Sequence, residues 1–226
     1  MQNNKTLVRL AAGAVLAAAA LSVQAQSKGN WMISGAVTHI SPNTSSGTLS
    51  PPAPPGTTVD IGADTQPTLA VGYMLTDNWS LELPIGFGFK HDINADGAIA
   101  GSGRIGTTRA LPVSLFAQYR FLEPTSAWRP YVMLGITYAY FYDEQGSATL
   151  NALNPLNPPG GTSLNIESRW GFTPGLGVTA RFAERWFVDL QYAHSFLKTT
   201  TTLNSGQSIS TKLNPDVYKI GVGMIF

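Results

Sequence analysis

Tyr218-Lys219-Ile220-Gly221-Val222-Gly223-Met224-Ile225-Phe226 closes the sequence, and in it large apolar residues alternate with glycine and lysine. Every second residue of a β-strand points to the same face. The apolar face carries Tyr218, Ile220, Val222, Met224 and Phe226, and the other face carries Lys219, Gly221 and Gly223. A free edge strand with such an apolar face would aggregate in water. Closure into a barrel surrounded by lipid removes the free edge, so this stretch predicts a membrane-embedded barrel.

The composition limits the class of protein. The 226 residues include 12% charged residues, 23 glycines and no cysteine, and the mean hydropathy of +0.03 is far below that of a helical membrane protein. The length fits one domain, and the lack of cysteine excludes disulfides, thiolate metal sites and cysteine nucleophiles. A formal net charge of +1 argues against a nucleic-acid partner, because such proteins concentrate lysine and arginine.

Residues 1–25 have the pattern of a signal peptide. Lys5 and Arg9 precede an apolar run from Leu10 to Leu21, and Val23-Gln24-Ala25 has an aliphatic and a small residue at the two positions that a signal peptidase reads. We expect cleavage after Ala25. The alternative, an N-terminal membrane anchor, requires about 20 apolar residues, and this run is shorter.

Eight segments of the mature chain, 26–226, have the alternation of β-strands. They cover about 30–41, 65–75, 79–91, 109–121, 128–142, 168–182, 186–197 and 212–226. Short turns alternate with long loops, which we expect at about 42–63, 92–108, 143–166 and 198–211. This pattern predicts an all-β fold, an eight-stranded antiparallel transmembrane β-barrel. In bacterial outer-membrane barrels the short turns and both termini face the periplasm, and the long loops are extracellular.

The distribution of charge supports lipid on the outside and a polar interior. On the predicted outward positions of the second to eighth strands, His194 is the only titratable residue among Asp, Glu, Lys, Arg and His. Aromatic residues such as Trp79 and Phe196 fall near the strand ends, as expected for two interfacial girdles. We therefore assign no ligand-stacking role to these aromatics.

Two groups of inward residues are candidates for a transport path. The first is a polar plug near the periplasmic end, formed by Glu82, Gln118, Arg120, Arg181, Asp189 and Lys219. Its bases and acids would pair, because an unpaired buried charge is costly; ordinary structural salt bridges are the alternative interpretation. The second group lines the lumen above the plug and consists of Met74, Pro84, Gly86, Phe116 and Ala193. An eight-stranded barrel can hold one small ligand but no wide aqueous pore.

The order of several short motifs resembles that of a known family. The motifs are Tyr73-Met74-Leu75-Thr76-Asp77-Asn78, Leu111-Pro112 followed by Ala117-Gln118-Tyr119, Arg129-Pro130-Tyr131-Val132 with Gly135-Ile136-Thr137-Tyr138, Trp170-Gly171 leading to Gly177-Val178, and Leu213-Asn214-Pro215. Together they resemble the OmpW family of outer-membrane proteins, which includes the AlkL alkane importers. The resemblance implies a barrel in the outer membrane of a Gram-negative bacterium that helps small hydrophobic molecules across and releases them sideways into the bilayer. The implied partners are membrane lipid, small hydrophobic solutes and, through Tyr218 to Phe226, the outer-membrane assembly machinery.

A lateral exit needs a weak seam in the barrel wall. Pro84 and Pro112 lie in the third and fourth strands, which are neighbours, and proline lacks the N–H donor of a ladder. We expect the lateral seam between these strands. Prolines absorbed by bulges of a closed wall are the alternative.

Other functions find less support in the sequence. His194 and Ser195 are neighbours in a strand and point to opposite faces, so they cannot form a catalytic pair, and we expect no enzyme activity. The histidines and acids form no cluster with the spacing of metal ligands. We expect no metal and no cofactor. A surface receptor or adhesin that acts through the long loops is the alternative function.

Overall fold

The computed structural model describes residues 26–156 and 158–226, so the predicted signal peptide lies outside the described residues. Strands account for most of this part of the chain. Their bounds are β1 Trp31–Ser41, β2 Ser45–Ser46, β3 Thr57–Ile61, β4 Asp64–Met74, β5 Trp79–Gly86, β6 Phe89–Gly97, β7 Arg104–Arg120, β8 Trp128–Gly146, β9 Leu164–Ile166, β10 Arg169–Arg181, β11 Trp186–His194, β12 Lys198–Leu203, β13 Ser208–Lys212 and β14 Asp216–Ile225. A short helix, α2, covers Ala148–Leu153. No helix among the described residues is long and apolar enough to cross a membrane.

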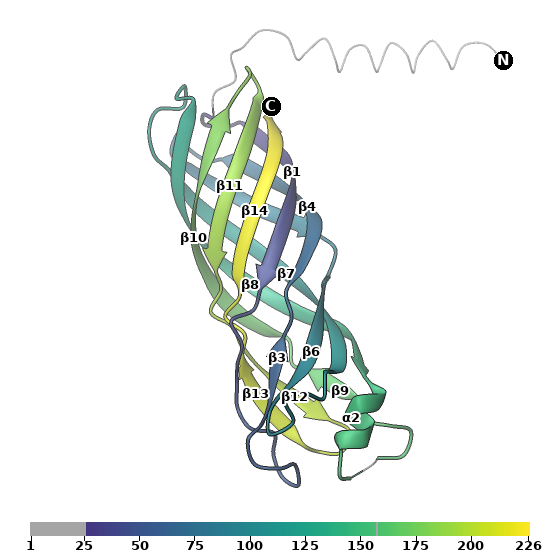
Figure 1. The fold of residues 1–226 in the computed structure, drawn as a ribbon. Helices are drawn as coiled ribbons and strands as arrows, with labels where there is room; N and C mark the ends of the chain where they lie inside the picture. Colours follow the sequence, from purple (N-terminus) through teal and green to yellow (C-terminus); the bar gives the residue numbers. More distant parts are fainter. Residues whose placement is uncertain (1–25, 157) are drawn as a thin grey trace, which may run out of the picture.

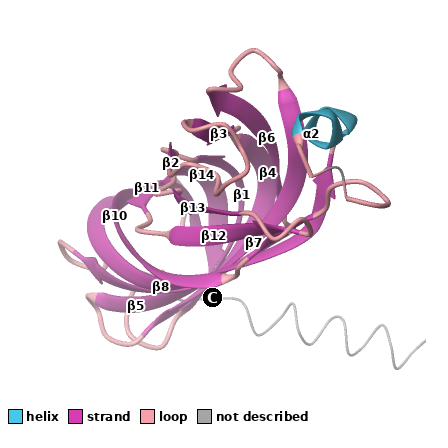
Figure 2. Cartoon of the chain, turned by 90° about the horizontal axis from the view of Figure 1, so that it is seen from below, coloured by secondary structure: helices cyan, strands magenta, loops and turns pink. Residues whose placement is uncertain are grey.

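The strands close into an antiparallel barrel. The ring runs β1-β4-β5-β7-β8-β10-β11-β14 and returns to β1, where Met32 pairs with Ile225. Figure 1 shows these strands tilted around one axis, and Figure 2 shows them curving around it in the end view. The predicted eight-stranded barrel is confirmed. In the third predicted strand the ladder is interrupted at Phe87 and Gly88, which divides it into β5 and β6.

The four segments predicted as loops contain strands and one short helix. β3 pairs with β6, and β6 with the start of β7, while β2, β13, β12 and β9 form a separate four-stranded sheet. The Ser, Thr and Gly content of these segments indicated loops, but threonine also fits the pleated surface of a strand. We call β2, β3, β6, α2, β9, β12 and β13 the extension. It continues the barrel at the end opposite the C-terminus (Figure 1).

The apolar positions predicted to face lipid are the exposed ones. Large apolar side chains at these alternating positions remain open to the surroundings, including Leu69, Leu83, Val132, Leu176 and Ile220. Their neighbours in sequence, such as Ala70 and Lys219, are buried inside the barrel. The barrel therefore presents an apolar exterior and a partly polar interior, the reverse of a protein folded in water.

Some inward glycines allow large side chains of the next strand to lie against the wall. A Cβ atom added at Gly177 would lie 2.5 Å from the ring of Tyr131 and 2.6 Å from the carbonyl oxygen of Leu190. At Gly135 the same atom would lie 2.4 Å from the ring of Phe116. The inward glycines at these positions therefore leave no open lumen, because neighbouring rings occupy the space.

We expect Gly177→Ala to destabilise the barrel by about 1–3 kcal/mol, the usual cost of overpacking a well-packed site. Outward Gly35 supplies the control, because a Cβ there meets only Leu69 at 3.8 Å. Urea unfolding in lipid vesicles, followed by tryptophan fluorescence, measures both variants. Equal free energies of unfolding for Gly177→Ala and Gly35→Ala would contradict the prediction.

Candidate functional site

Charged residues from three strands, β5, β11 and β14, meet inside the barrel. Lys219 of β14 places Nζ 2.7 Å from Glu82 Oε1 and 3.4 Å from Asp189 Oδ2. The side-chain amide of Gln118 donates to Glu82 Oε2 at 3.2 Å. All four residues are buried. The ammonium group thus bridges two carboxylates that would otherwise repel each other in a medium of low dielectric constant.

Arg120 extends this network across the barrel. Its guanidinium donates to Thr179 Oγ1 at 2.7 Å, to Gln118 Oε1 at 2.6 Å and to Ser80 Oγ at 3.1 Å. It also lies 4.7 Å from the centre of the Tyr131 ring, whose hydroxyl donates to Asp189 Oδ1 at 3.0 Å. From here on, the polar plug means Glu82, Gln118, Arg120, Asp189 and Lys219.

The structure joins these five predicted residues and leaves Arg181 out. The guanidinium of Arg181 donates to the carbonyl of Thr125 in the turn between β7 and β8. Arg181 is the last residue of β10, so it lies beyond the plug at the rim of the barrel. Sequence reasoning missed Tyr131, Thr179 and Ser80, although the alternation of their strands would have placed all three inward.

Met74 is not a lumen residue above the plug, contrary to the prediction. It is fully buried with Met32, Phe187 and Ile225 in an apolar cluster near the C-terminal end of the barrel. Its inward direction was predicted correctly, but it is the last residue of β4, next to the turn at Thr76–Asn78. This position puts it on the closed side of the plug.

Arg129 provides a second closure at the same end, and sequence reasoning assigned it no role in the interior. Its side chain is 1% exposed and donates to the carbonyls of Gln26 and Asp77, both at 2.6 Å, and of Leu122 at 3.1 Å. Backbone carbonyls of turns and of the N-terminal segment are available in any sequence, so such a partner set cannot be read from residue types. The end of the barrel where β1 begins and β14 ends is therefore filled with hydrogen-bonded side chains.

A chain of hydroxyl groups runs along the inner side of the barrel wall, from strand to strand, above the plug. Ser114 lies 2.8 Å from Thr137, Thr137 lies 2.9 Å from Thr173, and Thr173 lies 2.9 Å from Ser195, measured between side-chain oxygens. We call these four residues the hydroxyl belt. On the opposite strands, the Thr38 and Thr68 hydroxyls lie 2.7 Å apart. These groups satisfy one another, so they line the lumen without a free charge.

A cavity of about 220 Å³ extends from the plug into the extension. Lys219 and Gln191 contribute to its floor, and the hydroxyl belt contributes to its wall. The predicted lumen residues Pro84, Gly86, Phe116 and Ala193 all line it. The plug thus closes one end of the cavity, and the cavity continues from there into the extension.

The upper part of the cavity is apolar. Three residues of the segment predicted as a loop at 143–166 are buried in an apolar cluster: Leu150, Leu164 and Ile166. They pack with Ile93, Ile105, Leu197, Leu203 and Leu213. Leu153 packs against this cluster, whereas Leu156 is exposed. The extension is therefore a structured apolar wall around the cavity.

The ladder between β5/β6 and β7 is interrupted beside this cavity. Pairing of β5 with β7 ends at Glu82 and Phe116, and pairing of β6 with β7 begins at Phe89 and Ala110. Residues 83–88 therefore have no ladder partner on β7, and residues 111–115 of β7 pair only with β8. We call these two facing segments the seam; they contain Pro84 and Pro112. By contrast, the ladder of β10 with β8 continues through Pro174.

The closed antiparallel ring, its apolar exterior and its buried polar interior define an outer-membrane β-barrel. The model of the OmpW family matches residues 27–226. Outer membrane protein W of Vibrio cholerae is 31% identical over 227 residues, which cover 98% of this chain and 99% of that one. The chain belongs to the OmpW family and is a protein of the Gram-negative outer membrane.

Two further similarities agree with this assignment. Outer membrane protein AlkL of Ectopseudomonas oleovorans is 23% identical over 170 residues, covering 75% of this chain and 68% of that one. The crystal structure of OprG from Pseudomonas aeruginosa superposes with a TM-score of 0.81 at 26% identity, covering 91% of this chain and 99% of that one.

The plug geometry makes a specific prediction for Lys219→Met. This substitution leaves the buried carboxylates of Glu82 and Asp189 without their shared cation, so we expect a loss of about 3–5 kcal/mol in the free energy of unfolding. Adding Glu82→Gln should recover part of that loss, because it removes one of the two uncompensated charges. Urea unfolding in vesicles measures the cycle, with exposed Lys28→Met as the control. Equal stability of the single and double plug variants would refute the coupling.

Proposed function

We propose that this barrel mediates passive uptake of small hydrophobic molecules, which enter through the extension and leave through the seam into the bilayer. The observation that supports the proposal is the position of the seam: the ladder is interrupted beside an apolar cavity whose other end is closed by the plug. The family resemblance to AlkL-type importers points to the same class of solute.

The orientation follows from the two ends of the barrel. The amide of Trp31 donates to the carbonyl of Phe226, so the first and last strands end together on the plug side. In bacterial barrels that end faces the periplasm. In this orientation the extension faces the exterior, where it meets solutes first.

Each part of the proposed path has a separate physical role. The apolar cluster of the extension removes a hydrophobic molecule from water, which is favourable in proportion to the apolar area buried. The hydroxyl belt offers no free charge to hold the molecule, and the plug blocks movement toward the periplasm. The seam then leads to lipid, since Ile85, Phe87 and Val113 on its outer side are exposed apolar groups.

No chemical step is assigned to the barrel in this proposal. His194 is outward and its Nδ1 lies 2.8 Å from Asp216 Oδ1, whereas Ser195 is buried and bonded to Thr173. The two residues lie on opposite sides of the barrel wall, which separates a nucleophile from a base.

The substrate class can be tested by uptake in whole cells with the barrel present or deleted. We expect the barrel to accelerate uptake of medium-chain alkanes and similar apolar solutes, and to leave uptake of sugars of similar size unchanged. The reason is that an apolar wall cannot replace the hydrogen bonds that a sugar makes with water. Rates that show no preference for apolar solutes would overturn the proposed function.

The seam can be tested by restoring its missing donors. The double variant Pro84→Ala and Pro112→Ala supplies two backbone N–H groups, so the ladder can extend across the seam and uptake of apolar solutes should fall severalfold. Pro174→Ala is the matched control, because Pro174 lies in a continuous ladder. Folding is checked by the mobility of unheated protein in gels. Normal uptake by the folded double variant would exclude exit through this seam.

A further inference from the structure

On the outward face of the hairpin of β12 and β13, every side chain is a lysine, a threonine or a serine. Its cross-strand pairs are Lys198 with Lys212, Thr200 with Ser210 and Thr202 with Ser208. The alternate residues, including Thr199, Leu203 and Ile209, line the cavity. None of these six outward positions carries a carboxylate.

The two lysines oppose each other without a counter-ion. Like charges directly opposite on antiparallel strands destabilise the pairing. Both lysines are exposed, and neither takes part in an ion pair among the residues that the structure describes. The adjacent acid, Glu167, is engaged by Arg169 at 2.6 Å. The hairpin thus carries an uncompensated positive charge, to which an external anion would be attracted.

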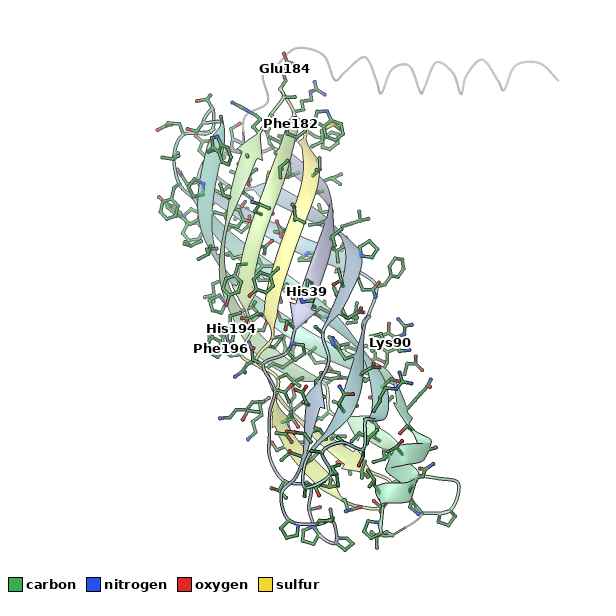
Figure 3. All side chains as sticks on the ribbon, viewed as in Figure 1. His39, Lys90, Phe182, Glu184, His194 and Phe196 are labelled. Atoms are coloured by element: carbon green, nitrogen blue, oxygen red, sulfur yellow. The ribbon has the colours of Figure 1, made fainter. Side chains whose placement is uncertain are left out.

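The lysine pair lies just beyond the exposed apolar and aromatic side chains of the barrel exterior. Phe196 is exposed, stacks on Phe172 with ring centres 4.5 Å apart, and precedes Lys198 by two residues on the same side. At roughly 3.3 Å per residue, Lys198 lies about 7 Å further along the chain than Phe196, in the direction of the extension. Figure 3 labels Phe196 and His194 where the barrel passes into the extension. The hydroxyl pairs follow further out along the hairpin.

We propose that this face binds lipopolysaccharide of the outer leaflet, with Lys198 and Lys212 holding a phosphate of lipid A. An ammonium group is a strong partner for phosphate, and basic residues next to an apolar belt recognise anionic lipid headgroups. The Thr200–Ser210 and Thr202–Ser208 pairs are placed to bond the sugars that extend away from the membrane. The orientation is that of the proposed function, with the extension on the exterior.

The experiment measures binding of purified lipid A to the folded full barrel in detergent micelles, by competition with a fluorescent lipid A. The test variant is Lys198→Gln with Lys212→Gln, and Lys28→Gln at the opposite end is the matched control. We expect the double variant to bind roughly thirtyfold more weakly, because two lysines near an anionic lipid contribute about 2 kcal/mol. Chemically dephosphorylated lipid A and inorganic phosphate are tested in parallel.

The free energy of unfolding, measured in micelles with and without lipid A, separates binding from a structural role. Because the lysines repel each other, the double variant should be at least as stable as the wild type without lipid, and lipid A should stabilise only the wild type and Lys28→Gln. Unchanged affinity of the double variant, or equal binding of dephosphorylated lipid A, would overturn the proposal. Competition by millimolar inorganic phosphate alone would also overturn it, since it would indicate a free-anion site. Solute uptake is not measured, so this result is independent of the transport proposal.

Discussion

Hydrogen bonding of the backbone in lipid is the constraint on which the rest of the structure depends. Hydrocarbon offers no partner to a free N–H or carbonyl group, so a strand can cross the bilayer only within a closed ladder. Pairing of β1 with β14, from Met32–Ile225 to Ser41–Asp216, completes the ring. Closure turns one face of every strand toward lipid and the other toward a narrow interior. The side chains of the plug and the belt are consequences of that division.

The interruption of the ladder at the seam costs free energy, because it leaves backbone groups without ladder partners. This interruption is confined to residues 83–88 and 111–115. Between the β5–β7 and β6–β7 pairings the register shifts by one residue, and the segments on either side include Pro84 and Pro112, which have no N–H to lose. Proline therefore lowers the cost of an opening, because fewer donors are left unpaired. Ile85 and Val113 present apolar side chains on the outer side, so this part of the wall is compatible with surrounding lipid.

Alternation in the sequence was enough to predict the barrel, the direction of nearly every side chain and most of the plug. It could not predict depth along the axis, which depends on the tilt and stagger of the strands; Met74 and Arg181 were therefore given the right face but the wrong level. The extension was missed because its threonine-rich segments have the composition of loops. Arg129 was missed because its acceptors are carbonyls supplied by distant turns.

The polar plug also has an electrical consequence. Ser80, Gln118 and Arg120 at its level are almost completely buried, and the charges of Glu82 and Asp189 are held by Lys219. A hydrated ion would have to break this network and leave most of its water behind, at a cost far above thermal energy. The described side chains at this level therefore leave no continuous water-filled path for an ion along the barrel axis.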